Sequence, residues 1–173
     1  MRITYFVATS LDGYIGGPQG QIDWLFTDGD YGYTAFLETV DAVAMGRATY
    51  DLTHTFGPDA LPAGIPAYVF THHPPEPGDA SVHVVEGDVA AFAARLASQN
   101  TQHLWLLGGG VLAGAFLAAG LITDYVVSIH PVMLGAGVPL FKGGYTPATL
   151  RLTSHEVYPN GLVQLTYRDA RAG

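Results

Sequence analysis

The segment 104–112, Leu-Trp-Leu-Leu-Gly-Gly-Gly-Val-Leu, constrains the fold more than any other, because an apolar run ends at three glycines and a helix-like pattern follows. Glycine lets backbone N–H groups approach a ligand closely, and the first turn of a helix favours negative charge. We therefore expect a strand, a turn and a helix, with a phosphate or pyrophosphate at Gly108, Gly109 and Gly110. A turn that needs glycine for its geometry alone is the alternative.

These glycines formally satisfy the dinucleotide fingerprint G-x-G-x-x-A, with Ala113 at the last position. In a Rossmann unit an acidic residue about 20 residues later ends the next strand and holds the ribose. Here the next strand-like run, 124–130, begins with its acidic residue and ends in Ser-Ile-His. Too little chain follows for a second βαβ half, so the sequence predicts a different nucleotide-binding α/β fold.

The hydrophobic pattern alternates between strands and helices, without an internal repeat or a long linker. The predicted strands are 2–9, 41–45, 67–71, 82–86, 103–107 and 124–130; the predicted helices are 33–39, one from residue 48 onward, one from the Asp88 cap to about residue 99, and 111–119. Residues 10–22 and the proline-rich residues 74–78 are predicted to be loops. Two last runs, 150–157 and 162–168, flank Tyr-Pro-Asn-Gly, which predicts a hairpin.

The predicted fold class is therefore α/β. We expect three layers, α/β/α, around a mixed, mostly parallel sheet that ends in an antiparallel C-terminal hairpin. The 173 residues, 49% of them hydrophobic, are expected to form a single domain over 1–173.

Composition also bounds the partners and the location. A net charge of −8, with seven Lys and Arg residues, argues against nucleic acid and anionic membranes. No apolar stretch is long enough to span a membrane, and we expect a cytoplasmic protein. Cysteine is absent and no two histidines have metal-ligand spacing, so no metal site is expected. The low charge and the positive mean hydropathy suggest a homodimer, with part of the apolar stretch 126–134 at its interface.

In parallel sheets, ligands bind beyond the carboxyl ends of the strands, so we expect four strand ends to meet at one site. These ends are 8–9, 45–49, 70–72 and the three glycines. Arg47 is notable because cations are so scarce, and it is suited to hold a phosphate. Its alternative is a surface ion pair or a helix-end cap. For Thr49, Thr71 and His72 the alternative is that each is a turn or cap residue.

Three runs taken together resemble the dihydrofolate reductase fold: Ala-Thr-Ser-Leu-Asp-Gly-Tyr-Ile-Gly at 8–16, Met-Gly-Arg-Ala-Thr-Tyr at 45–50, and Leu-Gly-Gly-Gly at 107–110. A fourth run, 131–141, is more similar to the riboflavin-biosynthesis branch of that superfamily, the RibD C-terminal domain. The resemblance covers nearly the whole chain in the right order. The zinc deaminase domain of the bifunctional riboflavin enzymes is missing, which indicates a stand-alone reductase-like domain.

The resemblance implies an NADPH-dependent reductase that transfers a hydride to a C=N or C=O carbon of a small heterocycle, such as a pterin, a flavin or a ribosyl-pyrimidine. It places Gly46, Arg47 and Thr49 at the phosphates, and Arg47, Thr71 and His72 near the adenosine 2′-phosphate. The residues that would bind the pyrophosphate and nicotinamide half are Gly108, Gly109, Gly110, Val111 and Leu112. The nicotinamide itself would contact Ala8, Ile15 and Gly16, with residues 13–22 as a lid.

The substrate half departs from the folate pattern. Folate reductases hold the pterin with a buried carboxylate, and here Asp28 and Asp30 are both out of register. No Arg or Lys lies between Arg47 and Arg95 to bind a glutamate tail, so folate is not the expected substrate.

We expect Trp24 and Asp28 to contact the substrate, Trp24 and Tyr31 to form its platform, and Asp30 with Tyr31 to supply the proton. Asp28, Asp12 or water are the alternative proton sources, and the acids could instead cap helices or turns. A catalytically silent homodimer that binds a nucleotide or a flavin is the alternative function.

Overall fold

The computed structural model describes residues 1–57, 60–73 and 82–171. The strands are β1 (Arg2–Ser10), β2 (Tyr14–Gly16), β3 (Ala42–Gly46), β4 (Ala67–Phe70), β5 (Val82–Val85), β6 (His103–Gly108), β7 (Asp124–His130), β8 (Val138–Pro139), β9 (Leu150–Val157) and β10 (Val163–Asp169). The helices are α1 (Tyr33–Leu37), α2 (Arg47–His54), α3 (Val89–Ser98) and α4 (Gly110–Ala118). The loop predicted at 74–78 lies outside the described residues.

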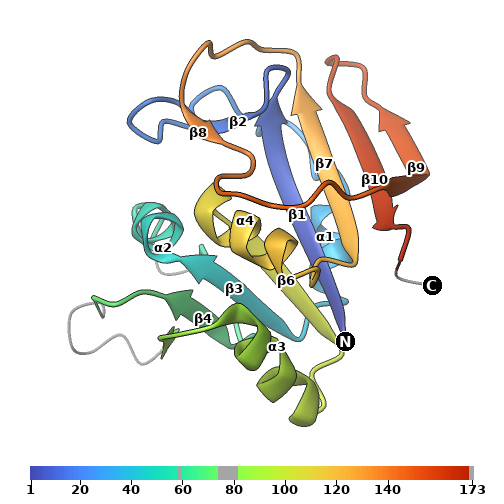
Figure 1. The fold of residues 1–173 in the computed structure, drawn as a ribbon. Coiled ribbons are helices and arrows are strands. Elements are labelled where there is room, and N and C mark those ends of the chain that lie inside the picture. The colour runs from blue at the N-terminus through green and yellow to red at the C-terminus, as the bar shows by residue number, and fades with distance from the viewer. Residues whose placement is uncertain (58–59, 74–81, 172–173) are drawn as a thin grey trace.

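Eight strands form one mixed sheet in the order β5-β4-β3-β6-β1-β7-β10-β9 (Figure 1). From β5 to β7 in this order, each strand is parallel to the next one. The last two strands differ, because β10 is antiparallel to both β7 and β9. The fold class is confirmed: an α/β sheet, mostly parallel, that ends in an antiparallel hairpin. The carboxyl ends of the parallel strands therefore share one edge, which we call the carboxyl edge.

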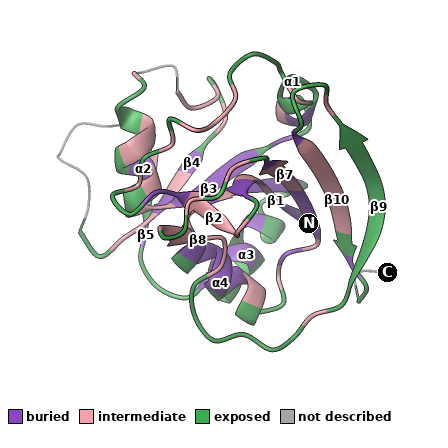
Figure 2. Cartoon of the chain, turned by 90° about the horizontal axis from the view of Figure 1, so that it is seen from above, coloured by how far each residue is buried: buried purple, intermediate pink, exposed green. Residues whose placement is uncertain are grey.

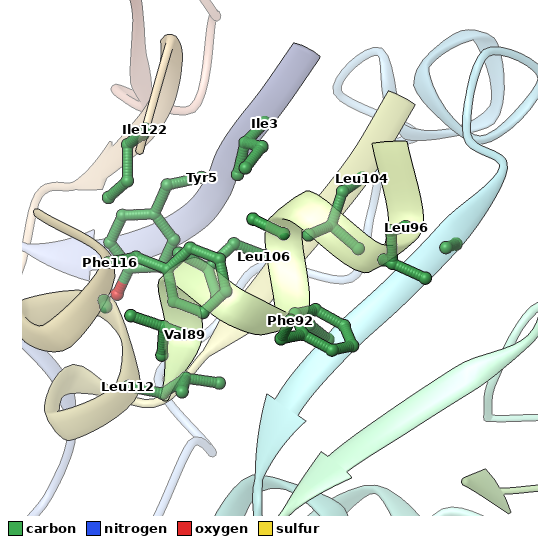
Figure 3. Packing of buried hydrophobic residues seen from close by; sticks show 14 of the residues in the cluster. Ile3, Tyr5, Val89, Phe92, Leu96, Leu104, Leu106, Leu112, Phe116 and Ile122 are labelled. Atoms are coloured by element: carbon green, nitrogen blue, oxygen red, sulfur yellow. The ribbon is translucent and has the colours of Figure 1, made fainter. Parts of the chain in front are cut away.

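One face of the sheet is covered by α3 and α4. Alternate side chains of β1 and β6, such as Tyr5 and Leu106, pack there against Phe92 of α3 and Phe116 of α4 (Figure 3). The predicted cap of α3 is present, because the carboxylate of Asp88 accepts a hydrogen bond from the Ala91 N–H at 3.0 Å. α4 is apolar nearly all round, since it lies between the sheet and the segment that follows β8.

The opposite face is covered by α1 and α2. Phe36 of α1 and Tyr50 of α2 are buried against Met45 of β3, Val69 of β4 and Trp105 of β6. Seen along the sheet, helices lie on both sides of a buried central layer, and β9 forms an exposed edge (Figure 2). The molecule thus has the three predicted layers.

Two parts of the sequence prediction differ from the structure. The expected loop 10–22 contains β2, which pairs antiparallel with β8. A three-residue strand whose partner lies more than 120 residues away leaves no local alternation to detect. The stretch 126–134 mostly belongs to β7, which lies between β1 and β10 in the sheet and is largely buried. Met133, beyond the strand, is exposed.

The described residues contain no helix long and apolar enough to cross a membrane. They also contain no group of three or more His, Asp or Glu side chains placed to hold a metal ion.

Candidate functional site

The glycine turn between β6 and α4 lies at the centre of the carboxyl edge. A Cβ atom added at Gly109 would lie 3.3 Å from Thr49 Oγ1 of α2 and 3.7 Å from Ile15 Cδ1 of β2. Gly46, at the end of β3, faces the Gly108 carbonyl, at 3.9 Å from its own Cβ position. Predicted cofactor residues from three separate segments, 15, 46–49 and 108–109, therefore meet around the backbone of Gly109.

Gly110 has a different reason to be glycine. A Cβ atom there would clash with the Pro139 carbonyl oxygen, and one at Gly114 would clash with the Lys142 carbonyl oxygen. The Lys142 N–H also donates to the Gly110 carbonyl at 2.9 Å. The third glycine of the motif thus lets a second chain segment pack against α4. For this glycine the alternative interpretation applies, in which geometry alone requires glycine.

The other predicted contacts of the nicotinamide half lie along the same edge. Ala8 is half-buried near the end of β1 and pairs with Ser128 of β7. Gly16 is buried in β2, and in the first turn of α4 Val111 is exposed whereas the side chain of Leu112 belongs to the core.

Arg47 begins α2, directly after β3. Its Nε donates to Asp51 Oδ1 at 2.7 Å, and its Nη1 donates to the His73 carbonyl at 2.6 Å. Thr71 Oγ1 accepts a hydrogen bond from the His73 N–H at 3.0 Å, so the turn after β4 is held beside Arg47. Arg47 and Thr71 thus both bond to His73, and Arg47 forms the surface ion pair that is its alternative; their roles at the 2′-phosphate stay predictions. The His72 side chain is exposed.

The segment predicted to form a lid is attached to the chain around β8. The Leu140 N–H donates to the Gly13 carbonyl at 2.9 Å. The Asp12 carboxylate accepts hydrogen bonds from Ser10 Oγ and from the N–H groups of Leu134 and Gly135, and these bonds lower its pKa. Asp12 therefore joins two loops, in agreement with its turn-forming alternative.

Aromatic side chains gather where β7 ends. The rings of Trp24 and Phe26 lie 5.2 and 4.9 Å from the buried ring of His130, measured between centroids. Burial lowers the pKa of His130, so its imidazole is neutral at physiological pH.

A polar network lies beside these rings. The Tyr31 hydroxyl donates to Asp28 Oδ1 and accepts from Asn160 Nδ2. The hydrogen bond to Asp28 raises the pKa of Tyr31 and outweighs the opposite effect of Asn160, so the phenol keeps its proton. The hydrogen bonds from Tyr31 and Asn160 lower the pKa of Asp28, so this carboxylate is charged. Gln164 Nε2 donates to the Tyr31 carbonyl and to Ser128 Oγ, each at 3.0 Å. Tyr31 also has a left-handed backbone conformation, with φ of 50°, which is rare for a bulky residue.

Asp30 lies nearby but faces its own helix. Its carboxylate accepts a hydrogen bond from the Thr34 N–H at 3.0 Å, and bonds from Thr34 lower its pKa. This is the capping arrangement that was its alternative, and a catalytic role for Asp30 stays a prediction.

The sequence interpretation missed four residues of this region: Phe26, His130, Asn160 and Gln164. Asn160 was interpreted only as part of the hairpin turn, because a Pro-Asn-Gly run is typical of turns. His130 closes an apolar strand, and no local pattern indicates that two aromatic rings lie against it. We call the set Trp24, Phe26, Asp28, Tyr31, His130, Asn160 and Gln164 the β7-end cluster.

Comparisons with known proteins agree with this architecture. The model of the RibD C-terminal domain family matches residues 1–164. The uncharacterized protein YwjB of Bacillus subtilis is 35% identical over 169 residues, which cover 96% of this chain and 97% of that protein. A putative riboflavin biosynthesis protein from Shewanella sp. PV-4 has a similar structure, with a TM-score of 0.88, 33% identity, and coverage of 99% and 100% of the two chains. The fold is also shared with a dihydrofolate reductase from Enterococcus faecalis, solved with NADP(H), at a TM-score of 0.71 and 18% identity over 98% of this chain and 96% of that one.

Proposed function

Because this chain belongs to the RibD C-terminal domain family, we propose that it is an NADPH-dependent reductase of a small heterocyclic substrate, a pterin-, flavin- or ribosyl-pyrimidine-like ring. When bound, NADPH would supply a hydride from its nicotinamide to a C=N or C=O carbon of that ring. Arg47 and Thr71 would bind the adenosine 2′-phosphate, and the N–H groups around Gly109 would receive the pyrophosphate.

One observation carries the proposal: Thr49 of α2 and Ile15 of β2 converge on the backbone of Gly109, which itself carries no side chain. Such a glycine at the first turn of a helix suits a pyrophosphate that must approach the backbone. Arg47 lies at the adjacent strand end, where its guanidinium can add a charge-assisted contact. With the cofactor along this side, the β7-end cluster is the part of the carboxyl edge left for the substrate.

For the proton we propose Tyr31. Its hydroxyl remains protonated at physiological pH, lies in the cluster, and is oriented by Asp28 and Asn160. Asp28 stays charged and would contact amino or N–H groups of the ring, next to Trp24. Asp30 remains an alternative donor, although its hydrogen bonds with Thr34 favour its charged form.

The test of the cofactor assignment is the pair Arg47→Ala and Arg151→Ala, each of which removes one positive charge. We expect Arg47→Ala to weaken NADPH by about 1.5–3 kcal/mol, the value of a charge-assisted hydrogen bond, and to leave NADH nearly unchanged. Arg151 is exposed on β9, so its variant should bind both cofactors as the wild type does. Fluorescence titration measures both affinities; equal losses of NADPH and NADH would place Arg47 at the pyrophosphate, and no loss would return it to a surface ion pair.

The second candidate function is a silent protein that binds a nucleotide or a flavin. It is favoured by one observation: Asp28 and Asp30 are both exposed and have lowered pKa values, so neither is a ready acid. Single-turnover NADPH oxidation with a panel of pterins, flavins and ribosyl-pyrimidines separates the two functions. In an active reductase, Tyr31→Phe should slow the step and alter its pH profile, whereas Tyr158→Phe, which removes the hydroxyl of the ring packed on Tyr31, should not.

A further inference from the structure

Positive charge is distributed unevenly over the molecule. All seven Lys and Arg residues of the sequence lie in the described part of the chain. Three of them form ion pairs at the edge opposite the carboxyl edge, two with Asp124 at 3.4 and 3.2 Å and one with Asp169 at 2.7 Å. A fourth faces one of these across the β9–β10 ladder. The four are Arg2, Arg151, Arg168 and Arg171.

These four charges are too distant to act on the β7-end cluster. The six steps along β7 from Asp124 to His130 span about 20 Å, at roughly 3.3 Å per residue. The Debye length at physiological ionic strength is about 8 Å, so the separation exceeds two screening lengths. Three of the four are also paired with carboxylates: Arg2 and Arg168 share Asp124, and Arg171 pairs with Asp169.

The remaining three cations lie elsewhere. Arg95 of α3 lies 5.6 Å from the ring of Phe92. The backbone of Lys142 is bonded to α4, on the face of the sheet opposite α1. Arg47 belongs to the cofactor side, bonded to the turn after β4. Within the described residues, therefore, no Lys or Arg belongs to the β7-end cluster.

The cluster itself is negative. Asp28 is charged and His130 is neutral at physiological pH, and the other members are aromatic rings, a phenol and two amides. A phosphate or carboxylate group brought here would lose part of its hydration and meet a like charge, with no cation to compensate. An uncharged ring with N–H or amino groups would bind favourably here, because Asp28 accepts hydrogen bonds and the aromatic rings offer apolar surface.

We propose that the substrate is an uncharged, planar, hydrogen-bond-donating heterocycle that carries neither a phosphate nor a carboxylate tail. The inference rests on the proposed function, because the NADPH assignment is what leaves the β7-end cluster to the substrate. The inference adds that the site selects its substrate by charge. When one ring exists with and without an anionic group, the form without that group binds more tightly.

The experiment compares ligands that share a ring and differ in charge, with the protein saturated by NADP⁺ so that binding is measured without turnover. Riboflavin and its 5′-phosphate are one pair, and 6-methylpterin and folate are the other. We expect the uncharged member to bind about tenfold more tightly or better, and the difference to shrink as salt is added. Equal binding, or tighter binding of the anionic member, would overturn the inference, and so would failure of both members of both pairs to bind.

A charge introduced into the cluster gives the reciprocal test. Asn160→Lys adds a cation at the exposed hairpin turn, and we expect it to reduce the preference for riboflavin over its phosphate several-fold. Gln99→Lys adds the same charge at the exposed end of α3, outside the cluster, and should keep the wild-type preference. If Asn160→Lys leaves the preference unchanged, charge in the cluster does not govern selection. NADPH binding to the wild-type protein is measured separately by titration. If the wild-type protein does not bind NADPH, the proposed function itself is refuted.

Discussion

At the scale of single residues, the site depends on how close a ligand can come to the backbone at Gly109. The motif of three glycines predicted this turn from sequence, and the cofactor roles of its members stay predictions. The structure separates the three: the Cβ position of Gly108 faces the Tyr5 ring, that of Gly109 faces Thr49 and Ile15, and that of Gly110 faces the Pro139 carbonyl. Spacing alone could not distinguish them, because the partner segment of Gly110 lies about 30 residues later in the chain.

We expect Gly109→Val to abolish measurable NADPH binding while the protein stays folded. The Cβ position lies 3.3 Å from Thr49 Oγ1, a tight contact that a small shift can relieve, and the γ-methyl groups would occupy the space assigned to the pyrophosphate. Titration with NADPH and a thermal melt measure the two effects. Gly144→Val is the matched control, since nothing lies within 4 Å of its Cβ position. Wild-type affinity in Gly109→Val would mean that no phosphate binds at this turn.

At the scale of helices and strands, most elements could be predicted because each has a local signal: a β-branched run, a cap or a turn. Their ends differ from the prediction by one or two residues, as for α1, which ends at Leu37 instead of Thr39. The β2–β8 pair and the contacts of Asn160 and Gln164 with Tyr31 could not be predicted. They join segments about 120 to 130 residues apart, and only the folded topology brings those together.

The cap of α3 allows a quantitative prediction. Asp88→Ala should lower the free energy of unfolding by about 1 kcal/mol, because the Ala91 N–H loses its acceptor at the helix start. Asp88→Asn keeps an acceptor and should cost only a small part of that. Urea denaturation followed by circular dichroism measures both. Equal stability of Asp88→Ala and the wild type would show that water replaces the cap without cost.

At the scale of the whole molecule, stability should depend on pH through buried histidine. His103 is buried between Thr4 of β1 and Thr39, with its ring nitrogens 2.8 and 3.0 Å from their hydroxyls, and burial lowers its pKa below 6.5. The unfolded chain therefore takes up protons below pH 6.5 that the folded chain excludes, and stability falls as the pH is lowered. Burial acts in the same direction on His130.

Thermal melts between pH 7.5 and pH 5 test this dependence. The wild-type melting temperature should fall across that range, and His103→Gln, which cannot titrate, should show a shallower fall from a lower starting value. His155→Gln, on the exposed strand β9, should keep the wild-type slope. A wild-type slope in His103→Gln would assign the acid sensitivity to other groups.

The homodimer stays a prediction, with a different surface from the one expected, because most of 126–134 is interior. Exposed apolar side chains lie instead on the edge strand β9, where Leu152 is 49% and Val157 is 66% exposed. We expect light scattering to show a dimer at micromolar concentration and Leu152→Asp to shift it toward monomer. Ser154→Asp, on the other face of the strand, is the control. A wild-type monomer would contradict the prediction.

The packing of the segment after β8 along α4 has a consequence for comparing sequences. Gly110 and Gly114 lie one helical turn apart, and each makes room for a carbonyl of the segment 139–142. A homologous chain with a larger residue at either position would have to route this segment elsewhere. The Leu140 N–H also donates to the Gly13 carbonyl, so such a chain would differ in the walls around the place proposed for the nicotinamide. The glycine pair is thus a diagnostic for sorting sequences of this kind by the shape of their pocket before any of them is assayed.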